Sequence, residues 1–279
     1  MTYTYRELTE LLQGRGIADA RSEAAWLICR FCGVDRAAIL TDKHRKWESA
    51  ELDAAVCRRC ERYPLQYIIG EWEFFGCTFR VSEDCLIPRP DTEILVEEAL
   101  KILPQNAVLC DLCTGSGCIA ISLLKARPDL RAVAVELSDK AVDIALENAR
   151  LNGVDDRLIL LCADVLADGV DKLKSLMKQE NITSFDAIVS NPPYIPTEDI
   201  STLEPELAFE PKMALDGGAD GLKFYRDIIK NYASLVRSGG YMLFEIGSDQ
   251  ARDVCALTEC EAVVVRDLGG NDRVVKISL

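Results

Sequence analysis

The stretch AVLCDLCTGSG at residues 107–117 joins an apolar run to a glycine-rich loop. The run is short and apolar, which is typical of a buried strand, and Gly115 and Gly117 permit a tight turn with close backbone approach to a ligand. A helical pattern follows at 118–126, and the first turn of that helix would offer free N–H groups to an electron-rich ligand. Because Ala120 replaces the third glycine of a dinucleotide-binding loop, the loop alone is weak evidence of function, and a tight turn without a ligand is the alternative.

Strands and helices alternate beyond residue 90. Short apolar runs predict strands at residues 107–112, 131–135, 158–162, 185–189 and 241–246. Helical patterns lie before and between them, at residues 91–100, 118–126, 139–151, 170–178 and 221–235. The alternation predicts an α/β fold with a mostly parallel, doubly wound sheet, and the runs at 262–266 and 273–278 predict a closing antiparallel hairpin.

The N-terminal region has helical patterning instead. Apolar residues three and four positions apart predict helices at residues 5–12, 20–32 and 49–62. From residue 67 the pattern changes to β-like runs, at residues 67–69 and 74–81. We therefore expect a small all-helical domain over residues 1–66, a β-hairpin linker over 67–87 and the α/β domain over 88–279.

The composition is that of a folded, soluble protein, with 49% hydrophobic and 28% charged residues. Lys and Arg number 32 against 46 Asp and Glu, a formal charge of −14, so we expect no non-specific binding to nucleic acid. No apolar run approaches the roughly 20 residues of a membrane span, and the start of the chain lacks the basic-then-apolar order of a signal peptide. We expect a cytoplasmic monomer with no membrane partner.

The 12 cysteines are scattered through apolar segments, as reduced thiols in a protein core are. Cys29 with Cys32 and Cys57 with Cys60 have C-x-x-C spacing, which permits a four-thiolate zinc site. Both pairs lie in helical patterns without the glycine-containing turns of a zinc knuckle, so we expect no metal. The single histidine, His44, lies in a polar stretch and is expected at the surface.

Two carboxylates follow the next two predicted strands. Ligands of an open α/β sheet bind beyond the carboxyl ends of its strands, where the strand order reverses. Glu136 lies 21 residues after Gly115, where an acid can accept both hydroxyls of a ribose; a helix-flanking acid before the natural N-cap Ser138 is the alternative. Asp164 follows the third strand, where it can accept from the amino group of adenine while Val165 contacts the ring.

The fourth strand ends in Asn191-Pro192-Pro193-Tyr194. The prolines restrict the backbone and remove N–H donors, which leaves the Asn191 side-chain oxygen and the Pro192 carbonyl as acceptors. Such acceptors suit a planar NH₂ group, whose nitrogen is a poor nucleophile because its lone pair is delocalised, so that a site must position it. The motif predicts transfer to an amide or exocyclic amine nitrogen, with a rigid turn after an edge strand as the alternative.

Together, the D-x-x-x-G-x-G loop, the acid after the second strand and the Asn-Pro-Pro-Tyr loop resemble the class I S-adenosylmethionine-dependent methyltransferases. Three further stretches, PLQYIIGEWEFFG at 64–76, IPRPDTE at 87–93 and GNDRV at 270–274, resemble the PrmC/HemK family of peptide chain release factor glutamine N(5)-methyltransferases. The resemblance covers essentially the full chain. It implies a Rossmann-like methyltransferase sheet, S-adenosylmethionine as cofactor with S-adenosylhomocysteine as product, and the glutamine of the release factors' Gly-Gly-Gln motif as substrate in translation termination.

The resemblance also implies roles for individual residues. Those implied at the cofactor are Asp111, Cys113, Thr114, Gly115, Ser116, Gly117, Glu136, Asp164, Val165 and Asn191. Those implied at the substrate are Arg89, Asn191, Pro192, Pro193 and Tyr194, of which Asn191, Pro192 and Tyr194 would be catalytic. The helical domain would recognise the release factor. The chain departs from the family where Cys113 stands in place of the usual glycine and where Val165, rather than a larger residue, follows the adenine-side acid.

Three other functions fit parts of the pattern. A glutamine methyltransferase acting on a ribosomal protein would carry the same motif, and only the flanking stretches argue against it. An amino-methyltransferase for adenine or cytosine in nucleic acid also needs a Pro-Pro-aromatic turn, but it should carry a basic recognition region, whereas this chain is acidic. A cofactor-binding module or adaptor without catalysis would not need an intact Asn-Pro-Pro-Tyr loop.

Overall fold

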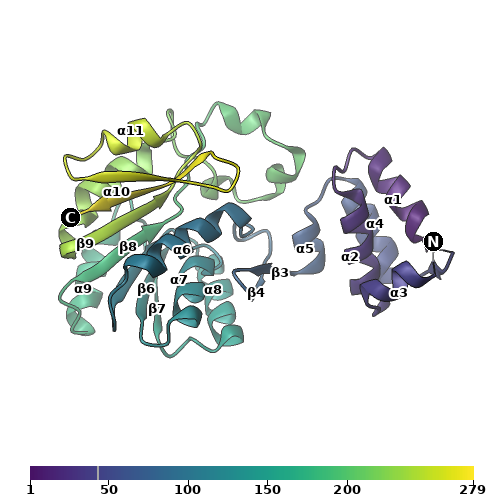
Figure 1. Cartoon of the computed structure of the whole chain (residues 1–279), viewed down its shortest axis with the longest axis horizontal. Helices are drawn as coiled ribbons and strands as arrows, with labels where there is room; N and C mark the ends of the chain where they lie inside the picture. The colour runs from purple at the N-terminus through teal and green to yellow at the C-terminus, as the bar shows by residue number, and fades with distance from the viewer. Residues whose placement is uncertain (43) are drawn as a thin grey trace. The chain divides into compact units, whose positions relative to one another are not determined.

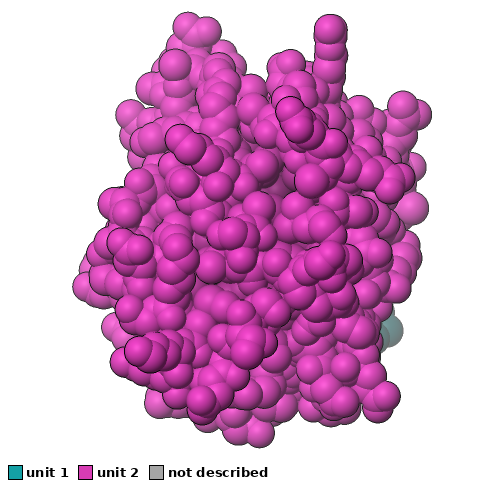
Figure 2. Space-filling view, turned by 90° about the vertical axis from the view of Figure 1, so that its left-hand side faces the viewer, with its two compact units in different colours: residues 1–71, 204–209 teal, residues 72–203, 210–279 magenta. Residues whose placement is uncertain are grey.

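The computed structural model describes residues 1–42 and 44–279. The chain divides into two compact units, the first made of residues 1–71 and 204–209 and the second of residues 72–203 and 210–279 (Figures 1 and 2). Figure 2 presents one face of the second unit, in magenta. None of the helices in the described ranges combines the length and the apolar character that a membrane span requires.

The first unit is helical, as its patterning predicts. Its helices are α1 (Tyr5–Gly14), α2 (Ala20–Cys32), α3 (Arg36–Thr41), α4 (Ala50–Cys60) and α5 (Leu65–Ile69), and β1 (Tyr3–Thr4) pairs antiparallel with β2 (Lys46–Trp47). Thr4 and Glu7 form a capping box at the start of α1, and Ser49 caps α4. The buried core of this unit includes Leu8, Leu12, Leu27, Ile28 and Leu52.

The predicted β-like run at residues 67–69 is wrong, because these residues belong to helix α5. Gly70, with φ of 81°, ends the helix in the left-handed region. A short apolar run cannot be assigned to a helix or a strand by periodicity alone, which explains the error. The hairpin strands begin after this glycine, as β3 (Glu71–Phe74) and β4 (Cys77–Arg80).

A segment distant in sequence completes the first unit. The 3₁₀ helix η3 (Pro205–Phe209) belongs to it, and Glu206 accepts hydrogen bonds from Arg59 at 3.0 Å and Arg62 at 2.7 Å. Phe209 packs edge-to-face against Tyr63, with 5.1 Å between ring centroids. Ion pairs and an aromatic contact therefore attach this segment to the rest of the first unit.

The second unit contains a seven-stranded sheet with the order β10-β11-β9-β8-β5-β6-β7. The strands are β5 (Val108–Leu112), β6 (Arg131–Glu136), β7 (Leu158–Cys162), β8 (Phe185–Ser190), β9 (Val236–Glu245), β10 (Ala262–Arg266) and β11 (Asp272–Ser278). Strands β5 to β9 pair in parallel, while β11 pairs antiparallel with β9 and with β10. These pairings confirm the predicted doubly wound sheet and its closing hairpin. The strand order reverses at β5, because β6 and β8 lie on opposite sides of it.

Helices cover both faces of the sheet (Figure 1). On one face lie α6 (Glu93–Ile102), α7 (Cys118–Ala126) and α8 (Asp139–Asn152), and on the other lie α9 (Gly169–Gln179), α10 (Lys223–Tyr232) and α11 (Ala251–Cys255). Because the parallel strands are buried on both faces, they read as continuous apolar runs in the sequence. The 3₁₀ helices η1 (Pro90–Thr92), η2 (Asp199–Thr202), η4 (Lys212–Ala214) and η5 (Ala233–Leu235) complete the unit.

Candidate active site

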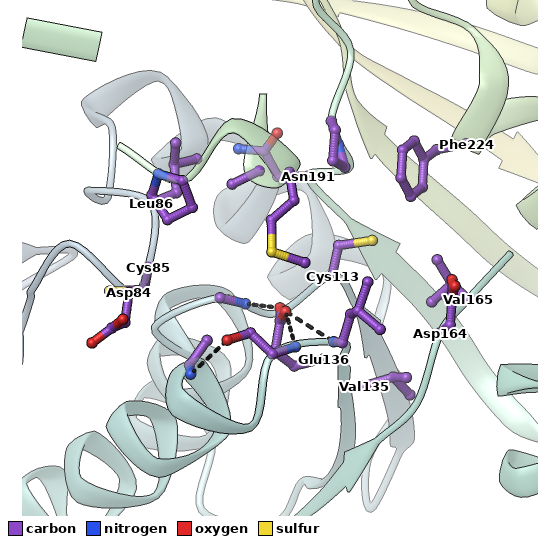
Figure 3. A pocket seen from close by; sticks show the side chains of 18 of the residues that line it. Asp84, Cys85, Leu86, Cys113, Val135, Glu136, Asp164, Val165, Asn191 and Phe224 are labelled. Atoms are coloured by element: carbon purple, nitrogen blue, oxygen red, sulfur yellow. Dashed lines mark hydrogen bonds between the residues drawn. The ribbon is translucent and has the colours of Figure 1, made fainter. Parts of the chain in front are cut away.

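Loops that follow β5, β6, β7 and β8 meet at the carboxyl edge of the parallel strands, around the reversal of strand order, and line a pocket (Figure 3). Of the residues predicted from sequence, its wall includes Cys113, Gly115, Glu136, Asp164, Val165, Asn191 and Pro193. Leu137 of the loop after β6 also lines it, and other segments complete the wall, with Asp84, Cys85, Leu86, Met213 and Phe224 among their residues. The four predicted loops are thus brought together in one place.

A second pocket adjoins the first. The two share Leu86, Cys113, Gly115 and Asn191. The predicted residues Arg89, Thr114 and Ser116 line this second pocket, together with Thr92. The predicted residues Asp111, Gly117, Pro192 and Tyr194 line neither of the two pockets. The predicted set therefore separates into residues that face a ligand space and residues that lie behind it.

The loop after β5 depends on left-handed backbone. Cys113, Gly115 and Gly117 have φ angles of 61°, 55° and 81°. Cys113 therefore adopts a conformation that glycine takes most easily. A Cβ atom on Gly117 would lie 2.7 Å from Ile121 Cδ1, whereas a Cβ atom on Gly115 would meet nothing within 4 Å. The backbone at Gly115 consequently lies open to the pocket, while Gly117 is required for packing.

Asp111 supports this loop from behind. It is fully buried, and its Oδ2 accepts hydrogen bonds from Thr114 Oγ1 at 2.6 Å and from the Ala120 backbone N–H at 3.2 Å. Burial raises the pKa of Asp111 to about 7. Asn148 of α8 supports the loop from the other side, by donating to the Ser116 carbonyl at 2.9 Å. The loop is therefore ordered by the protein itself.

Glu136 presents a carboxylate that three backbone N–H groups already hold. Its Oε2 accepts from Gly115 at 2.9 Å, and its Oε1 accepts from Leu137 at 2.9 Å and from Ser138 at 3.0 Å (Figure 3). A carboxylate has about four acceptor sites, so acceptor capacity is left for a ligand in the pocket. Glu136 thereby joins the glycine loop to the start of α8.

The pocket wall near Asp164 combines one carboxylate with apolar groups. Asp164 Oδ1 accepts from the Leu166 backbone N–H at 2.8 Å. Val165 is buried, and its carbonyl accepts from the Tyr232 hydroxyl at 2.9 Å. Phe224 of α10 lies on the same side of the pocket as Asp164 and Val165 (Figure 3). This wall suits a flat, largely apolar ligand with a hydrogen-bond donor at one edge.

The loop after β8 presents Asn191. Ser190, the last residue of β8, donates to the Leu112 carbonyl of β5 at 2.6 Å, which ties together the two strands beside the reversal. Asn191 is half-buried, and its Nδ2 donates to Thr92 Oγ1 at 3.2 Å. Because the nitrogen end of the amide is engaged there, the oxygen end is left to accept from a ligand.

The backbone that follows is held from behind. The Tyr194 carbonyl accepts from Gln250 Nε2 at 2.9 Å. A Cβ atom on Gly217 would lie 2.7 Å from Tyr194 Cα, so only glycine permits this approach of the two backbones. Burial raises the pKa of Tyr194 to about 12, which keeps its hydroxyl protonated at neutral pH.

Arg89 carries its own partner. It forms an ion pair with Glu210, whose side chain is 1% exposed. Glu210 also accepts from the Ile87 backbone N–H at 3.1 Å. The stretch around Arg89 is thereby fastened next to the second pocket.

Sequence reasoning missed several pocket residues. Leu137 directly follows Glu136 in the sequence, and this neighbour of a predicted ligand-binding acid could have been predicted to line the pocket. Leu86 lies in the predicted linker and Phe224 in the predicted helix at residues 221–235, but no local pattern places either side chain at the pocket, and only the folded chain brings them there.

The strand order, with this pocket at its reversal, defines a Rossmann-like methyltransferase domain. Residues 90–204 match the family model described as methyltransferase small domain, and residues 4–70 match the PrmC N-terminal domain. The chain is 39% identical to a release factor glutamine methyltransferase of Geobacter sulfurreducens, over 98% of this chain and 96% of the relative. A relative with the same description from Thermodesulfovibrio yellowstonii is 37% identical, over 91% of this chain and 90% of its own. The chain belongs to the release factor glutamine methyltransferase family.

A likeness to a solved structure supports the fold alone. The hMettl16 catalytic domain is 14% identical, with a TM-score of 0.55 over 84% of this chain and 84% of that chain. The fold class predicted from the sequence is confirmed.

Proposed function

We propose that this protein transfers a methyl group from S-adenosylmethionine to the side-chain amide nitrogen of the glutamine in the Gly-Gly-Gln motif of peptide chain release factors. The observation that carries the proposal is the position of Asn191, which lines both adjoining pockets. The first pocket has the polar and apolar groups that a nucleoside needs, and the Asn191 loop has acceptors that suit a planar NH₂ group. Membership of the family supports a release factor as the substrate.

The groups around the first pocket fit S-adenosylmethionine. Glu136 retains acceptor capacity for the ribose hydroxyls beside its three backbone N–H partners. Asp164 would accept from the adenine amino group, while Val165 and Phe224 provide apolar contact to the ring. The open backbone at Gly115 would lie along the methionine part. Bound there, S-adenosylmethionine supplies a methyl group that its sulfonium activates for transfer.

Asn191 would hold the glutamine amide in position. Because its Nδ2 is bonded to Thr92, its Oδ1 accepts one amide N–H, and the Pro192 carbonyl accepts the other. These acceptors orient the nitrogen and stabilise its hydrogens as they become acidic, so positioning and electrostatics supply most of the rate enhancement. Tyr194 lines neither pocket and would support this loop from behind, with its hydroxyl protonated because burial raises its pKa to about 12. No strong base is needed before attack, because the methylated nitrogen loses a proton readily.

The first unit would recognise the surface of the release factor, so that the Gly-Gly-Gln loop of the release factor reaches Asn191. The match of residues 4–70 to the PrmC N-terminal domain supports this role. The protein would act as a monomer in the cytoplasm and use no metal.

Mass spectrometry of a purified release factor, incubated with this protein and S-adenosylmethionine, tests the proposal. We expect one added methyl on the Gly-Gly-Gln glutamine, and none when that glutamine is replaced by alanine. Asn191→Ala should lower kcat/KM for the release factor about a hundredfold. An unmodified glutamine in the presence of bound cofactor would refute the proposal, and ribosomal proteins and nucleic acids would then be tested as acceptors.

A further inference from the structure

Two of the signature stretches, at residues 87–93 and 270–274, supply residues around Glu245, a buried carboxylate near Asn191 that the proposed reaction does not use. Thr92 comes from the first stretch and Arg273 from the second. Glu245, the last residue of β9, meets them there. We call Thr92, Glu245 and Arg273 the Asn191 support cluster.

The cluster is a buried polar group directly behind Asn191. Thr92 and Glu245 are each 1% exposed. Thr92 Oγ1 accepts from Asn191 Nδ2 at 3.2 Å. The polar side chains of Thr92 and Asn191 both lower the pKa of Glu245, so they favour its ionised form. Among the residues that the structure describes, Glu245 Oε2 has no hydrogen-bond partner. Burying a carboxylate whose hydrogen bonds are incomplete lowers the stability of the folded protein. A functional role for Glu245 would account for a carboxylate at this position.

Arg273 connects the cluster to its surroundings. Its Nη2 lies 3.1 Å from Asp91 Oδ2 and 3.2 Å from Asp267 Oδ2. The guanidinium lowers the pKa of Glu245, whereas Asp91 raises it. Burial is the larger effect and brings the pKa of Glu245 to about 7.

Other ionisable groups also face Glu245. They are the hydroxyls of Tyr194 and Tyr225 and the thiol of Cys118. Burial raises the pKa of each of the three, so all are protonated at neutral pH. Arg273 is therefore the only cation among the groups named here as acting on Glu245.

An asparagine amide has a donor end and an acceptor end of nearly equal size, so its orientation depends on its partners. Ionised Glu245 and the Thr92 oxygen together form an acceptor surface. That surface attracts Nδ2 and repels Oδ1, and it therefore turns Oδ1 toward the substrate. In the reverse orientation, Nδ2 would meet the N–H groups of the substrate amide, donor against donor.

We infer that Thr92 and Glu245 are positioning residues that select the orientation of the Asn191 amide in which Oδ1 receives the substrate, with Arg273 holding the cluster in place. This inference rests on the proposed function, in which Asn191 holds the glutamine amide.

A dependence on pH follows from the same contacts. When Glu245 is protonated, its O–H becomes a donor and can donate to Asn191 Oδ1, so the wrong orientation is no longer excluded. In the wild-type protein, kcat should therefore rise as the pH increases through about 7, where Glu245 ionises.

The test compares three variants with a matched control. Thr92→Val removes the hydroxyl at nearly constant volume, Thr92→Ser retains it, and Glu245→Gln removes the charge. Glu98→Gln is the control, because Glu98 is also a buried carboxylate of the second unit, 8% exposed, but pairs with Lys101 and Lys276 away from the pocket. Thermal unfolding verifies that each variant is folded.

Thr92→Val and Glu245→Gln should lower kcat at pH 8 about tenfold or more, the size of effect typical for a group that orients a functional side chain. Thr92→Ser should retain most of the wild-type kcat, and Glu98→Gln should keep both the rate and the rise with pH. Glu245→Gln should lack the rise. Wild-type kcat in Thr92→Val, or an unchanged pH profile in Glu245→Gln, would overturn the inference.

A second measurement does not depend on turnover. In ¹⁵N-labelled protein, the side-chain NH₂ signal of Asn191, identified by its loss in Asn191→Ala, should shift with pH around 7 and should not do so in Glu245→Gln. If the signal titrates but the release factor glutamine is not methylated, the proposed function fails and the cluster stands. If the glutamine is methylated but the signal does not titrate, the cluster fails alone.

Discussion

Glu136→Gln should weaken the binding of S-adenosylmethionine by about a hundredfold or more. In the free protein, Oε1 and Oε2 accept three backbone N–H groups at 2.9 to 3.0 Å. In the variant, an NH₂ group replaces one oxygen and meets a backbone donor, and the ribose hydroxyls lose a charged acceptor. A hydrogen bond to a charged group contributes about 1.5–3 kcal/mol, so two weakened ribose contacts correspond to about 3 kcal/mol and thus to roughly a hundredfold in Kd.

Isothermal titration calorimetry with S-adenosylmethionine and S-adenosylhomocysteine measures this effect. Glu97→Gln is the matched control, because it removes the same charge from an exposed position on α6, and its Kd should equal that of the wild type. Thermal unfolding without ligand separates loss of affinity from loss of fold. A Glu136→Gln protein that is folded and binds within about twofold of the wild type would refute the assignment of Glu136 to the ribose.

Three further outcomes are expected. Gly117→Ala places a methyl group 2.7 Å from Ile121 Cδ1 at a φ of 81°, so the free energy of unfolding measured in urea should fall by at least about 2 kcal/mol; an unchanged midpoint would contradict the packing described. Burial raises the pKa of Asp111 to about 7, so the native state retains a proton that the unfolded chain releases from about pH 4 upward, and the stability due to this group is lost as the pH rises to about 7. Asp111→Asn lacks that loss. The free energy of unfolding of the variant minus that of the wild type should therefore rise by roughly 2 kcal/mol from pH 5.5 to pH 8. A difference that does not vary with pH would show that the pKa of Asp111 is not raised. Glu206→Gln weakens the pairing with two arginines of the first unit and should cost about 2 kcal/mol in urea unfolding, whereas Glu204→Gln at an exposed position should cost nothing measurable; equal effects would show that the pairing does not stabilise the unit.

The fold was predictable where local pattern and tertiary environment agree. The parallel strands are buried on both faces and therefore read as apolar runs, and α7 and α8 between them keep helical spacing and end near the predicted residues. The prediction failed at residues 67–69, where a run too short to show a period lies in α5. It was silent over residues 199–214, where the 3₁₀ helices have no periodic signal of their own.

The site was predictable to the extent that strand ends define it. Glu136 ends a strand, and Asp164 and Asn191 each follow one. Because parallel strands end at the same edge of the sheet, the topology predicted that these residues meet in one pocket. The sequence did not predict whether the side chain of each predicted site residue faces the pocket. Asp111 lies in the same motif as Gly115, yet its side chain turns inward to Thr114.

By itself, the sequence determined the class of fold, the order of the loops that carry polar groups and the resemblance to one family, because these depend on local spacing along the chain. Only the tertiary structure decided which segments distant in the sequence contact one another. Phe224 reaches the pocket from α10, Glu206 returns to the first unit, and Glu245 and Thr92 meet behind Asn191. Such contacts join residues far apart in sequence, and they arise from the packing of helices and loops onto the finished sheet, which no local pattern encodes.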